Sequence, residues 1–390
     1  MKILFANNLI GFYGGVELVV LNYARGLARR GHTCAIAYGI EGRDATTYGA
    51  EFSAIYPCKD FGVSESGQSF DEIMAEVNPD VVFFHKVANL PEGIEHDSSI
   101  RKVRMVHDHD LWCPKGTGYY THNRRTCHVA AGWRCYLDGA FLERSEGGVL
   151  PVKLTSVQRK IREMRRSHAF DSVLTLSTYM RDQLIRNGFP PALVHICHPV
   201  LEHDYPEATP VPEAPNLIFV GSLIRGKGVD FLLRSLKLVT CPFHLDIVGT
   251  GKSEDELRSL CAELGLSDQV TFVGWVDHDD VAQYYRNAKL TVVPSCWPEP
   301  FALVGQESMR HGRPVVAFDV GGISNWLDHE ETGYLVPEQD TVAFAAAVEC
   351  LLRDTSLAQE MGTCASGRVK ERFSFEAFLD IVEGQLEGSP

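Results

Sequence analysis

Two carboxylates, eight residues apart, mark the part of this chain whose residue types are best suited to chemistry. Glu299 stands between two prolines, which keep its loop out of a helical conformation, and Glu307 lies in a segment that reads as a helix. Unpaired amides at the start of such a helix, with the helix dipole behind them, bind anions. We therefore expect Glu299 to accept hydrogen bonds from sugar hydroxyls and Glu307 from ribose hydroxyls, beside a phosphate. We expect this helix to begin near Phe301 or Ala302, which leaves the amides of Ala302, Leu303 and Val304 unpaired.

A glycine-rich turn earlier in the second half carries two cations. Arg225 and Lys227 stand two residues apart, after a strand-like run and before a helical pattern. A guanidinium and an ammonium that reach one pyrophosphate stabilise the negative charge that builds up on a departing diphosphate. Each motif alone also has a non-functional explanation. Arg225 and Lys227 could be ordinary surface charges, and the two glutamates could be a helix cap and a solvated helix residue. Together they predict a site for a nucleotide-sugar.

Glycines follow several predicted strands, where a backbone without Cβ can approach a ligand. Gly14 and Gly15 come directly before the first helical pattern. Their turn is not G-x-G-x-x-G, so a dinucleotide fingerprint is absent and a plain turn is the alternative. The corresponding positions in the second half, with two neighbours that could offer backbone groups to a base, are Gly221, Gly249, Gly274, Trp275 and Val276.

The fifth predicted strand ends in histidines and aspartates. His107, Asp108, His109 and Asp110 stand at its C-terminal end, where ligands of open parallel sheets bind. The spacing of the two aspartates imitates a metal-binding D-x-D motif. The Arg and Lys of the glycine-rich turn already supply a cation's charge, so we expect no catalytic metal and no other cofactor. Which of the two histidines belongs to the site stays open at this point.

Short apolar runs alternate with helical patterns in both halves of the chain. Continuous apolar strands between helices predict parallel sheets covered on both faces, and two such sets predict an α/β protein of two doubly wound domains. The proline-rich, acidic stretch 201–215 reads as a linker. It separates an N-terminal domain over 1–200 from a C-terminal domain over 216–371. An amphipathic pattern over 372–388 predicts a helix that packs back on the first domain.

The composition is that of a soluble globular protein, with 45% hydrophobic and 23% charged residues. No run approaches the 18 apolar residues of a membrane span, and no cleavage site follows the first strand-like run. The 11 cysteines are odd in number and scattered, which fits thiols in a reducing cytoplasm better than a disulfide framework. We therefore expect a cytoplasmic protein.

One stretch is basic although the chain as a whole has a net charge of −14. Residues 101–170 hold 14 Lys and Arg against 6 Asp and Glu, and the helical pattern over 153–168 sets arginines opposite an apolar stripe. A docked surface helix that is merely basic is one explanation. Our hypothesis is that this segment meets an anionic membrane surface or a lipid-diphosphate acceptor. Nucleic acid is not expected, because the basic stretch is small and the chain is acidic.

The order of these motifs resembles the retaining family-4 glycosyltransferases of GT-B fold, over nearly the whole chain. The resemblance implies two Rossmann-like domains facing across a cleft, with a UDP- or GDP-linked sugar held mainly by the C-terminal domain. It also implies transfer with retention, by front-face attack on an oxocarbenium-like centre without a fixed protein nucleophile. The motifs that carry it are Gly14-Gly15, His107-Asp108, Gly221-x₃-Arg225-x-Lys227, Phe272-Val-Gly274 and Glu299-x₇-Glu307.

The resemblance also implies roles for single residues. Arg225 and Lys227 would hold the diphosphate, Glu307 the ribose and Glu299 the donor sugar, while His107 would lie beside the reacting carbon. Gly14 and Gly15 would border the phosphate and the acceptor. The His-Asp-x₄-Cys-Pro form found here resembles a bacterial subset that acts in cell-surface polysaccharide or glycolipid synthesis. Such an enzyme would work at the inner face of the cell membrane.

The irregular stretch 111–150 is rich in Gly, Cys and Arg and longer than an ordinary connection, which is typical of functional loops. We read it as a loop that faces the acceptor. A three-Cys, one-His zinc site is the alternative, although its spacing lacks the CxxC pair of structural zinc. The acceptor-side residues would be Asp108, His109, Asp110, Arg124 and Arg125. The zinc ligands would be Cys113, Cys127, His128 and Cys135.

Three other functions compete with sugar transfer. A nucleotide-sugar epimerase or a phosphorylase would share the two-domain architecture but would need no glycan acceptor. A two-lobed sugar-binding protein would also have hinged α/β domains. The cationic turn and the missing export signal argue against this last alternative.

Overall fold

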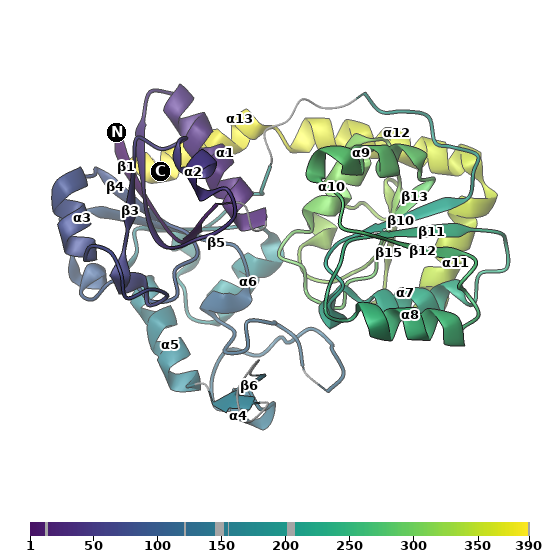
Figure 1. Cartoon of the computed structure of the whole chain (residues 1–390), viewed down its shortest axis with the longest axis horizontal. Helices are drawn as coiled ribbons and strands as arrows, with labels where there is room; N and C mark the ends of the chain where they lie inside the picture. The colour runs from purple at the N-terminus through teal and green to yellow at the C-terminus, as the bar shows by residue number, and fades with distance from the viewer. Residues whose placement is uncertain (12–14, 121, 145–151, 155, 201–206, 389–390) are drawn as a thin grey trace. The chain divides into compact units, whose positions relative to one another are not determined.

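The chain folds into two units, drawn in Figure 1. This computed structural model describes residues 1–390 apart from 12–14, 121, 145–151, 155, 201–206 and 389–390. Unit 1 comprises residues 1–117, 128–202 and 374–390, and unit 2 comprises residues 118–127 and 203–373. Among the described residues, no helix is both long and apolar enough to span a membrane.

Unit 1 is built on a parallel sheet that, in the described part of the chain, has seven strands in the order β3-β2-β1-β4-β5-β8-β9. All four residues of β4 (Val81–Phe84) and of β8 (Ser172–Thr175) are buried, as expected for strands with helices on both faces. The core beside β4 gathers aromatic side chains, among them Phe61, Phe70 and Phe84. The other strands of this sheet are β1 (Lys2–Ile10), β2 (Thr33–Glu41), β3 (Ala54–Pro57), β5 (Arg101–Val106) and β9 (Val194–Ile196).

Helices flank this sheet on both sides, and a short antiparallel pair of strands lies apart from it. The helices are α1 (Gly15–Arg29), α2 (Ala45–Gly49), α3 (Phe70–Val77), α4 (Arg134–Leu137), α5 (Val157–Arg166), α6 (Thr178–Arg186) and α13 (Phe375–Glu387). The paired strands are β6 (Leu142–Arg144) and β7 (Val152–Leu154). Single turns of 3₁₀ helix include η3 (His109–Leu111) and η4 (Ser167–Ala169).

Unit 2 repeats the design with a parallel sheet of six described strands, in the order β12-β11-β10-β13-β14-β15. Its strands are β10 (Asn216–Val220), β11 (His244–Val248), β12 (Val270–Gly274), β13 (Leu290–Val293), β14 (Val315–Phe318) and β15 (Gly333–Val336). Its helices are α7 (Val229–Leu236), α8 (Glu254–Glu263), α9 (His278–Asn287), α10 (Leu303–Arg310), α11 (Thr341–Arg353) and α12 (Thr355–Arg372), and η6 (Arg225–Lys227) precedes α7. The predicted fold class, two doubly wound α/β domains, is confirmed.

The last helix returns to unit 1, where α13 lies beside α1 (Figure 1). It starts cleanly because Ser374 caps it by accepting a hydrogen bond from the amide of Ala377. Arg30, at the end of α1, then bonds the carboxylates of Glu376 and Glu383, each at 2.6 Å. This is the helix predicted over residues 372–388.

The division differs from the predicted one at residues 118–127 and in the predicted linker, of which residues 207–215 group with unit 2. Residues 118–127 were expected in the N-terminal domain, but their contacts group them with unit 2. They form a β-hairpin in which Tyr119 pairs with Thr126, and the amide of Cys127 donates to the carbonyl of Gly118 at 2.8 Å. Part of the predicted linker, residues 201–206, lies outside the described residues.

Candidate functional site

In unit 2 the two predicted motifs meet at the carboxyl edge of the sheet. The ammonium of Lys227 lies 2.7 Å from Oε1 of Glu299, and the hydroxyl of Ser295 donates to the same oxygen at 2.5 Å. Glu299 is only 4% exposed, so this ion pair is largely shielded from water. The carbonyl of Gly226, in the middle of the turn, accepts hydrogen bonds from the amides of Cys296 and Trp297 at 2.9 and 2.8 Å. The cationic turn and the Glu299 loop are thus one structure.

Glu307 lies on α10, whose first turn is fixed by contacts with Trp326. The helix begins at Leu303, one or two residues later than predicted, and Ala302 before it has a left-handed backbone with φ of 65°. Gly305 is required in this turn, because a Cβ there would stand 2.0 Å from the ring of Trp326. The indole N–H of Trp326 donates to the carbonyl of Phe301 at 2.5 Å, which fixes the entry to the helix. Among the described residues, the amides of Leu303 and Val304 have no intrahelical partner, as an anion site needs, whereas that of Gly305 donates to the carbonyl of Ala302 at 3.0 Å.

A tyrosine orients the carboxylate of Glu307. The hydroxyl of Tyr285 lies 3.2 Å from Oε2 of Glu307, within donating distance. Burial, and to a smaller extent the charge of Glu307, raises the pKa of Tyr285 well above its ordinary value. The phenol therefore keeps its proton and donates a hydrogen bond. The other carboxylate oxygen of Glu307 is free of this bond.

Three of the predicted glycines converge at the same edge. The amide of Gly249 donates to the carbonyl of Gly274 at 2.8 Å, and a Cβ on Gly249 would stand 2.1 Å from the carbonyl oxygen of Gly221. The side chain of Trp275 is 71% exposed, and Val276 follows it in the same loop. This close backbone approach is the reason for glycine in these turns. In unit 1, Gly15 begins α1, whereas Gly14 lies outside the described residues.

The hairpin 118–127 braces the cationic turn. The guanidinium of Arg124 forms two parallel bonds to the carboxylate of Asp230, at 2.9 and 2.5 Å, and donates to the carbonyl of Arg225 at 2.9 Å. It also lies over the ring of Phe231, 4.5 Å from its centre. Tyr119 packs edge-on against Trp297 of the Glu299 loop. Arg124, expected on the acceptor side with Arg125, therefore binds beside the donor-side residues, while Arg125 is exposed.

In unit 1 a pair of buried histidines closes the ends of neighbouring strands. Nδ1 of His85, after β4, lies 2.9 Å from Nε2 of His107, after β5. Burial lowers the pKa of His107 to about 4 and that of His85 well below its ordinary value. Both rings are therefore neutral at pH 7, and one proton is shared between the facing nitrogens. Within the described part of the chain, no other hydrogen bond is made by His107.

A lysine occupies the space between the two aspartates of the D-x-D-like motif. The ammonium of Lys86 lies 2.5 Å from Asp108 and 3.0 Å from Asp110. Burial acts to raise the pKa of Asp108, but Lys86 outweighs it and holds the pKa below its usual value. His109 points elsewhere, fully buried against the rings of Trp112 and Tyr179. Of the two candidate histidines, His107 is the one that lines a cavity.

That cavity lies entirely within unit 1 and has a volume of about 540 Å³. It opens at the carboxyl ends of β4 and β5 and is bounded on one side by α5. His107 lies in its wall, together with five cations and three carboxylates. The charged residues are Lys86, Arg104, Lys115, Arg159, Lys160, Asp108, Asp110 and Glu163.

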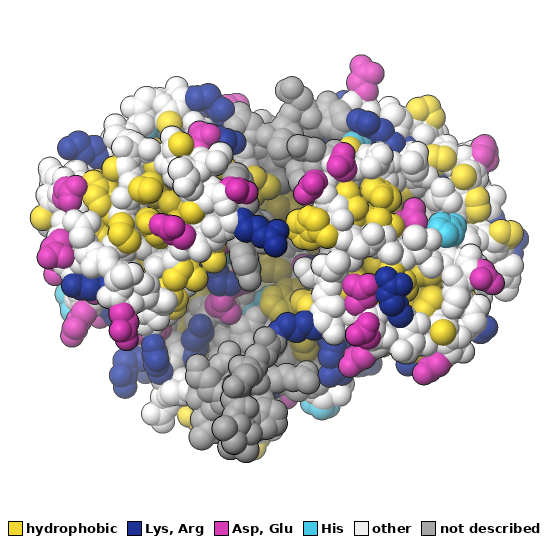
Figure 2. All heavy atoms as spheres, in the orientation of Figure 1, with side chains coloured by type: hydrophobic (Ala, Val, Ile, Leu, Met, Phe, Trp, Pro, Cys, Tyr) yellow, Lys and Arg dark blue, Asp and Glu magenta, His cyan; other side chains and the backbone are white. Residues whose placement is uncertain are grey.

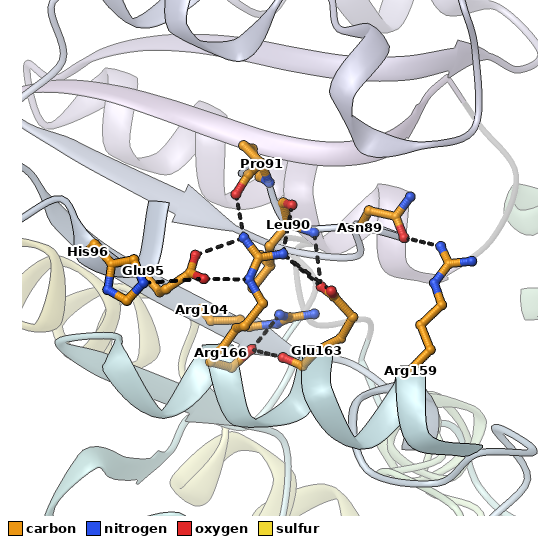
Figure 3. Close-up of polar contacts among 10 residues, drawn as sticks. Asn89, Leu90, Pro91, Glu95, His96, Arg104, Arg159, Glu163 and Arg166 are labelled. Atoms are coloured by element: carbon orange, nitrogen blue, oxygen red, sulfur yellow. Dashed lines mark hydrogen bonds and ion pairs between the residues drawn. The ribbon is translucent and has the colours of Figure 1, made fainter. Parts of the chain in front are cut away.

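The basic helix α5 is held to the loop after β4 by one of its own arginines (Figure 3). Arg166 bonds both carboxylate oxygens of Glu95, at 2.9 and 2.7 Å, and donates to the carbonyls of Leu90 and Pro91. It also lies 3.2 Å from Glu163. Arg166 is therefore a structural residue, whereas Arg162 and Arg165 of the same helix are exposed.

The cysteines of the irregular stretch do not converge. In the part of the chain that the structure describes, Cys113, Cys127, His128 and Cys135 do not gather their ligand atoms closely enough to hold a metal. Among the described residues, the side chains whose ligand atoms gather closely enough for a metal are His32, Glu383 and Glu387 instead. In this cluster Glu383 is already bonded by the guanidinium of Arg30 and by the ring of His32, so these protein contacts account for its position.

Four residues that contact the candidate residues of their own unit were not singled out from the sequence: His85 and Lys86 in unit 1, and Tyr285 and Ser295 in unit 2. A signal existed for two of them, because His85 and Lys86 directly follow a buried strand, as His107 and Asp108 do. Tyr285 lies within a helical pattern and Ser295 at a strand end, where nothing in the local sequence marks them.

Comparison with known proteins agrees with this architecture. Residues 13–205 match the model of "Glycosyltransferase Family 4", and residues 214–354 match that of "Glycosyl transferases group 1". The chain belongs to the family-4 glycosyltransferases of GT-B fold. A structure of the Anabaena protein HepE with UDP superimposes with a TM-score of 0.76, at 18% identity, over 100% of both chains.

Two curated relatives show how far the sequence similarity extends. An uncharacterized glycosyltransferase of Methanocaldococcus jannaschii is 33% identical over 162 residues, which cover 41% of this chain and 41% of the relative. The chain therefore matches less than half of that relative's length. A D-inositol 3-phosphate glycosyltransferase of Streptomyces bingchenggensis is 27% identical over 355 residues, which cover 80% of this chain and 78% of the relative.

Proposed function

We propose that this chain is a retaining, metal-independent glycosyltransferase that uses a nucleotide-sugar donor. The observation that carries the proposal is the meeting of the two predicted motifs in unit 2. Arg225 and Lys227 stand in one turn, and Glu299, in the loop before the amides of Leu303 and Val304 that open α10, is bonded to Lys227. Cations and amides of this kind bind a diphosphate, and the carboxylates bind hydroxyl groups.

The chemistry asked of these residues is electrostatic. When the bond between the sugar and the diphosphate breaks, negative charge accumulates on the departing phosphate. We propose that Arg225, Lys227 and the amides of Leu303 and Val304 receive that charge, which supports the reaction without reorganisation of the protein. Glu299 then holds the sugar through its hydroxyls, and retention follows from front-face attack by the acceptor without a covalent intermediate on the protein.

We propose UDP as the nucleotide, with GDP as the alternative that an experiment must exclude. Structures of the Anabaena protein contain UDP, UDP with glucose, and UDP-glucose. Oε1 of Glu307, whose other carboxylate oxygen is bonded by Tyr285, is suited to the ribose hydroxyls.

We propose that the acceptor is a glycan or lipid-linked sugar and that it enters the cavity of unit 1, beside His107. The neutral imidazole of His107 supports a role in positioning the reacting sugar or acceptor hydroxyl. We further propose that the protein works in the cytoplasm, at the inner face of the membrane, in cell-surface polysaccharide synthesis. The exposed Arg162 and Arg165 of α5 are the residues suited to an anionic membrane surface.

The first experiment is a thermal-shift titration with UDP-, GDP-, ADP- and TDP-sugars. A ligand at about 100 times its dissociation constant adds about 2.7 kcal/mol to the free energy of unfolding. We expect a selective shift that is lost in Lys227→Ala and Glu307→Ala but kept in Arg234→Ala, a control at an exposed arginine of α7.

Two results would contradict the proposal. A folded wild-type protein that responds to none of these nucleotides has no donor site and returns the sugar-binding alternative to first place. Release of an epimerised nucleotide-sugar, or of a sugar phosphate when inorganic phosphate is supplied, would identify an epimerase or a phosphorylase.

A further inference from the structure

The cavity of unit 1 has more positive charge than its own carboxylates can neutralise. Lys86 forms ion pairs with both Asp108 and Asp110, and Glu163 lies 3.2 Å from Arg166. Lys115 is paired with Asp138, 2.8 Å away. The remaining cations of the wall have no carboxylate in contact within the described structure. They are Arg104, Arg159 and Lys160.

Each of these three cations has a neutral partner or none. Nη1 of Arg104 donates to the hydroxyl of Ser167 at 2.8 Å, and Nη2 of Arg159 donates to the amide oxygen of Asn89 at 2.6 Å. Lys160 makes no hydrogen bond or ion pair with the described residues. Dark blue side chains gather on the surface of unit 1 over α5 (Figure 2). A cavity lined in this way attracts an anion.

Arg104 is the most informative of the three, because it is only 8% exposed. Burial lowers its pKa to about 10, although Glu163 and Asp108 attract its charge from a distance. A buried guanidinium is unfavourable unless its donors are matched by an anion. An apolar side chain would fill this position equally well, as Met105 and Val106 fill the next two positions of β5.

The wall that carries these cations is held rigidly. Arg166 ties the loop at Leu90 and Pro91 to α5, and Arg159 reaches back to Asn89 of the same loop (Figure 3). Arg104 lies under this arrangement, beside Glu163. Donors fixed in this way before the ligand arrives bind an anion without a further loss of side-chain freedom.

We propose that this cavity binds a phosphate or diphosphate group on the acceptor, with Arg104 as its buried ligand and Arg159 and Lys160 as its outer ligands. The inference rests on the proposed function, since it names the class of acceptor that the transferase uses. A phosphate bound beside His107 would set the distance between the charged end of the acceptor and the hydroxyl that receives the sugar.

The test is a calorimetric titration of the UDP-saturated protein with inorganic pyrophosphate, with glycerol as the uncharged control. UDP keeps pyrophosphate away from the donor turn. The main variant is Arg159→Ala with Lys160→Ala, whose side chains lie at the surface, and Arg104→Gln is the buried variant. The matched control is Arg162→Ala with Arg165→Ala, which removes two charges from the same helix outside the cavity.

We expect pyrophosphate to bind the wild type at one site and glycerol not to bind. Because the double variant loses the charge-assisted hydrogen bonds of two cations, it should bind pyrophosphate at least about tenfold more weakly. The control should change affinity less than twofold. Equal binding by wild type, double variant and control, or none by a wild type that does bind UDP, would overturn the inference. Failure to bind UDP at all would instead refute the proposed function.

A second titration separates the two sources of the phosphate. Phosphatidylcholine vesicles that carry a polyprenyl diphosphate sugar are compared with soluble glucose 6-phosphate. Binding that is lost with Arg159 and Lys160 supports the inference in either case, and assigns the phosphate to a lipid-linked or a soluble acceptor. Vesicle binding that only the Arg162 and Arg165 control loses would assign the helix to the membrane surface and contradict the cavity assignment.

Discussion

At the scale of single residues, unit 1 keeps two imidazoles uncharged by burying them against each other. His85 and His107 share one proton across 2.9 Å, and burial lowers the pKa of both. Protonation of either ring would place a positive charge beside the other and close to Lys86. The pair thus presents a neutral His107 to the cavity at physiological pH.

This arrangement predicts how stability depends on pH. Above about pH 6.5, the pKa of an unperturbed histidine, both rings are neutral in the folded and unfolded states and there is no penalty. As the pH falls from 6.5 toward 4, the unfolded chain binds protons that the folded one refuses, so the free energy of unfolding should fall. The expected slope is about 1.4 kcal/mol per pH unit for each histidine. Urea unfolding at pH 7, 6 and 5 measures it, and His107→Gln should flatten the slope; an unchanged slope would contradict this account.

The ion pair between Lys227 and Glu299 predicts that stability and donor binding can be separated. Lys227→Ala leaves the carboxylate of Glu299 almost fully buried without its cation, which should cost about 1–3 kcal/mol of folding free energy. The double variant Lys227→Met with Glu299→Gln removes both charges and should recover most of that loss. Denaturant unfolding measures the first effect. Calorimetry with UDP-glucose should find both variants impaired, and full binding by the double variant would rule out a donor role for the pair.

At the scale of elements, the hairpin 118–127 leaves the chain of unit 1 and packs on the donor-side turn of unit 2. Arg124 joins Asp230, at the start of α7, to the carbonyl of Arg225. The turn that carries Arg225 and Lys227 is therefore braced from outside its own sequence. Arg124, which we expected on the acceptor side, contacts the turn that carries Arg225 and Lys227.

We expect Arg124→Ala to weaken the binding of UDP-glucose roughly tenfold, because two charge-assisted bonds that hold the turn are lost. Arg125→Ala is the control, since Arg125 is the exposed neighbour. Calorimetry of donor binding and the KM for acceptor distinguish the two roles of Arg124. A normal donor affinity with a raised acceptor KM would restore the original acceptor-side assignment.

The start of α10 supplies a matched pair of glycine substitutions. In Gly305→Ala the new methyl group would stand 2.0 Å from the buried ring of Trp326, so we expect a loss of about 1–3 kcal/mol and weaker donor binding. Gly367→Ala, in α12, meets nothing within 4 Å and should instead stabilise unit 2 by about 0.5–1 kcal/mol. Thermal unfolding with and without UDP-glucose measures both. Similar behaviour of the two variants would show that Trp326 does not govern the helix start.

At the scale of the whole molecule, the two units draw on parts of the chain that are far apart in sequence. Helix α13 follows unit 2 but packs on α1, where Leu379 is buried against Gly26 and Arg30 bonds three carboxylates of the helix. Unit 1 can therefore complete its packing only after α13 has been synthesised.

Leu379→Ala should consequently destabilise unit 1 by about 2–4 kcal/mol, because it leaves a cavity in a buried interface. Leu379 belongs to unit 1. Donor binding by unit 2 should therefore stay within twofold of wild type. Hydrogen–deuterium exchange resolves the two units, with faster exchange expected in β4 and β5 and unchanged exchange in β13 and β14. Faster exchange in both units would mean that they unfold as one.

The sequence by itself determined the fold class and the donor-side motifs. Buried parallel strands show as continuous apolar runs. Arg225, Lys227 and Glu299 lie in the loops that follow two such runs, and Glu307 lies in the helix after the second loop. Because parallel strands all end at the same edge of a sheet, strand ends that are distant in sequence must lie near each other. That rule is enough to bring the two motifs together without knowing any side-chain contact.

Only the tertiary structure decided which partners hold these residues. Tyr285 beside Glu307, and Arg124 beside Asp230, are separated by 22 and 106 positions, and no local pattern records such contacts. The choice between His107 and His109 depended on which ring faces the cavity and which packs on Trp112. Side-chain direction after a strand end is set by packing against other elements, and that packing is a property of the folded chain.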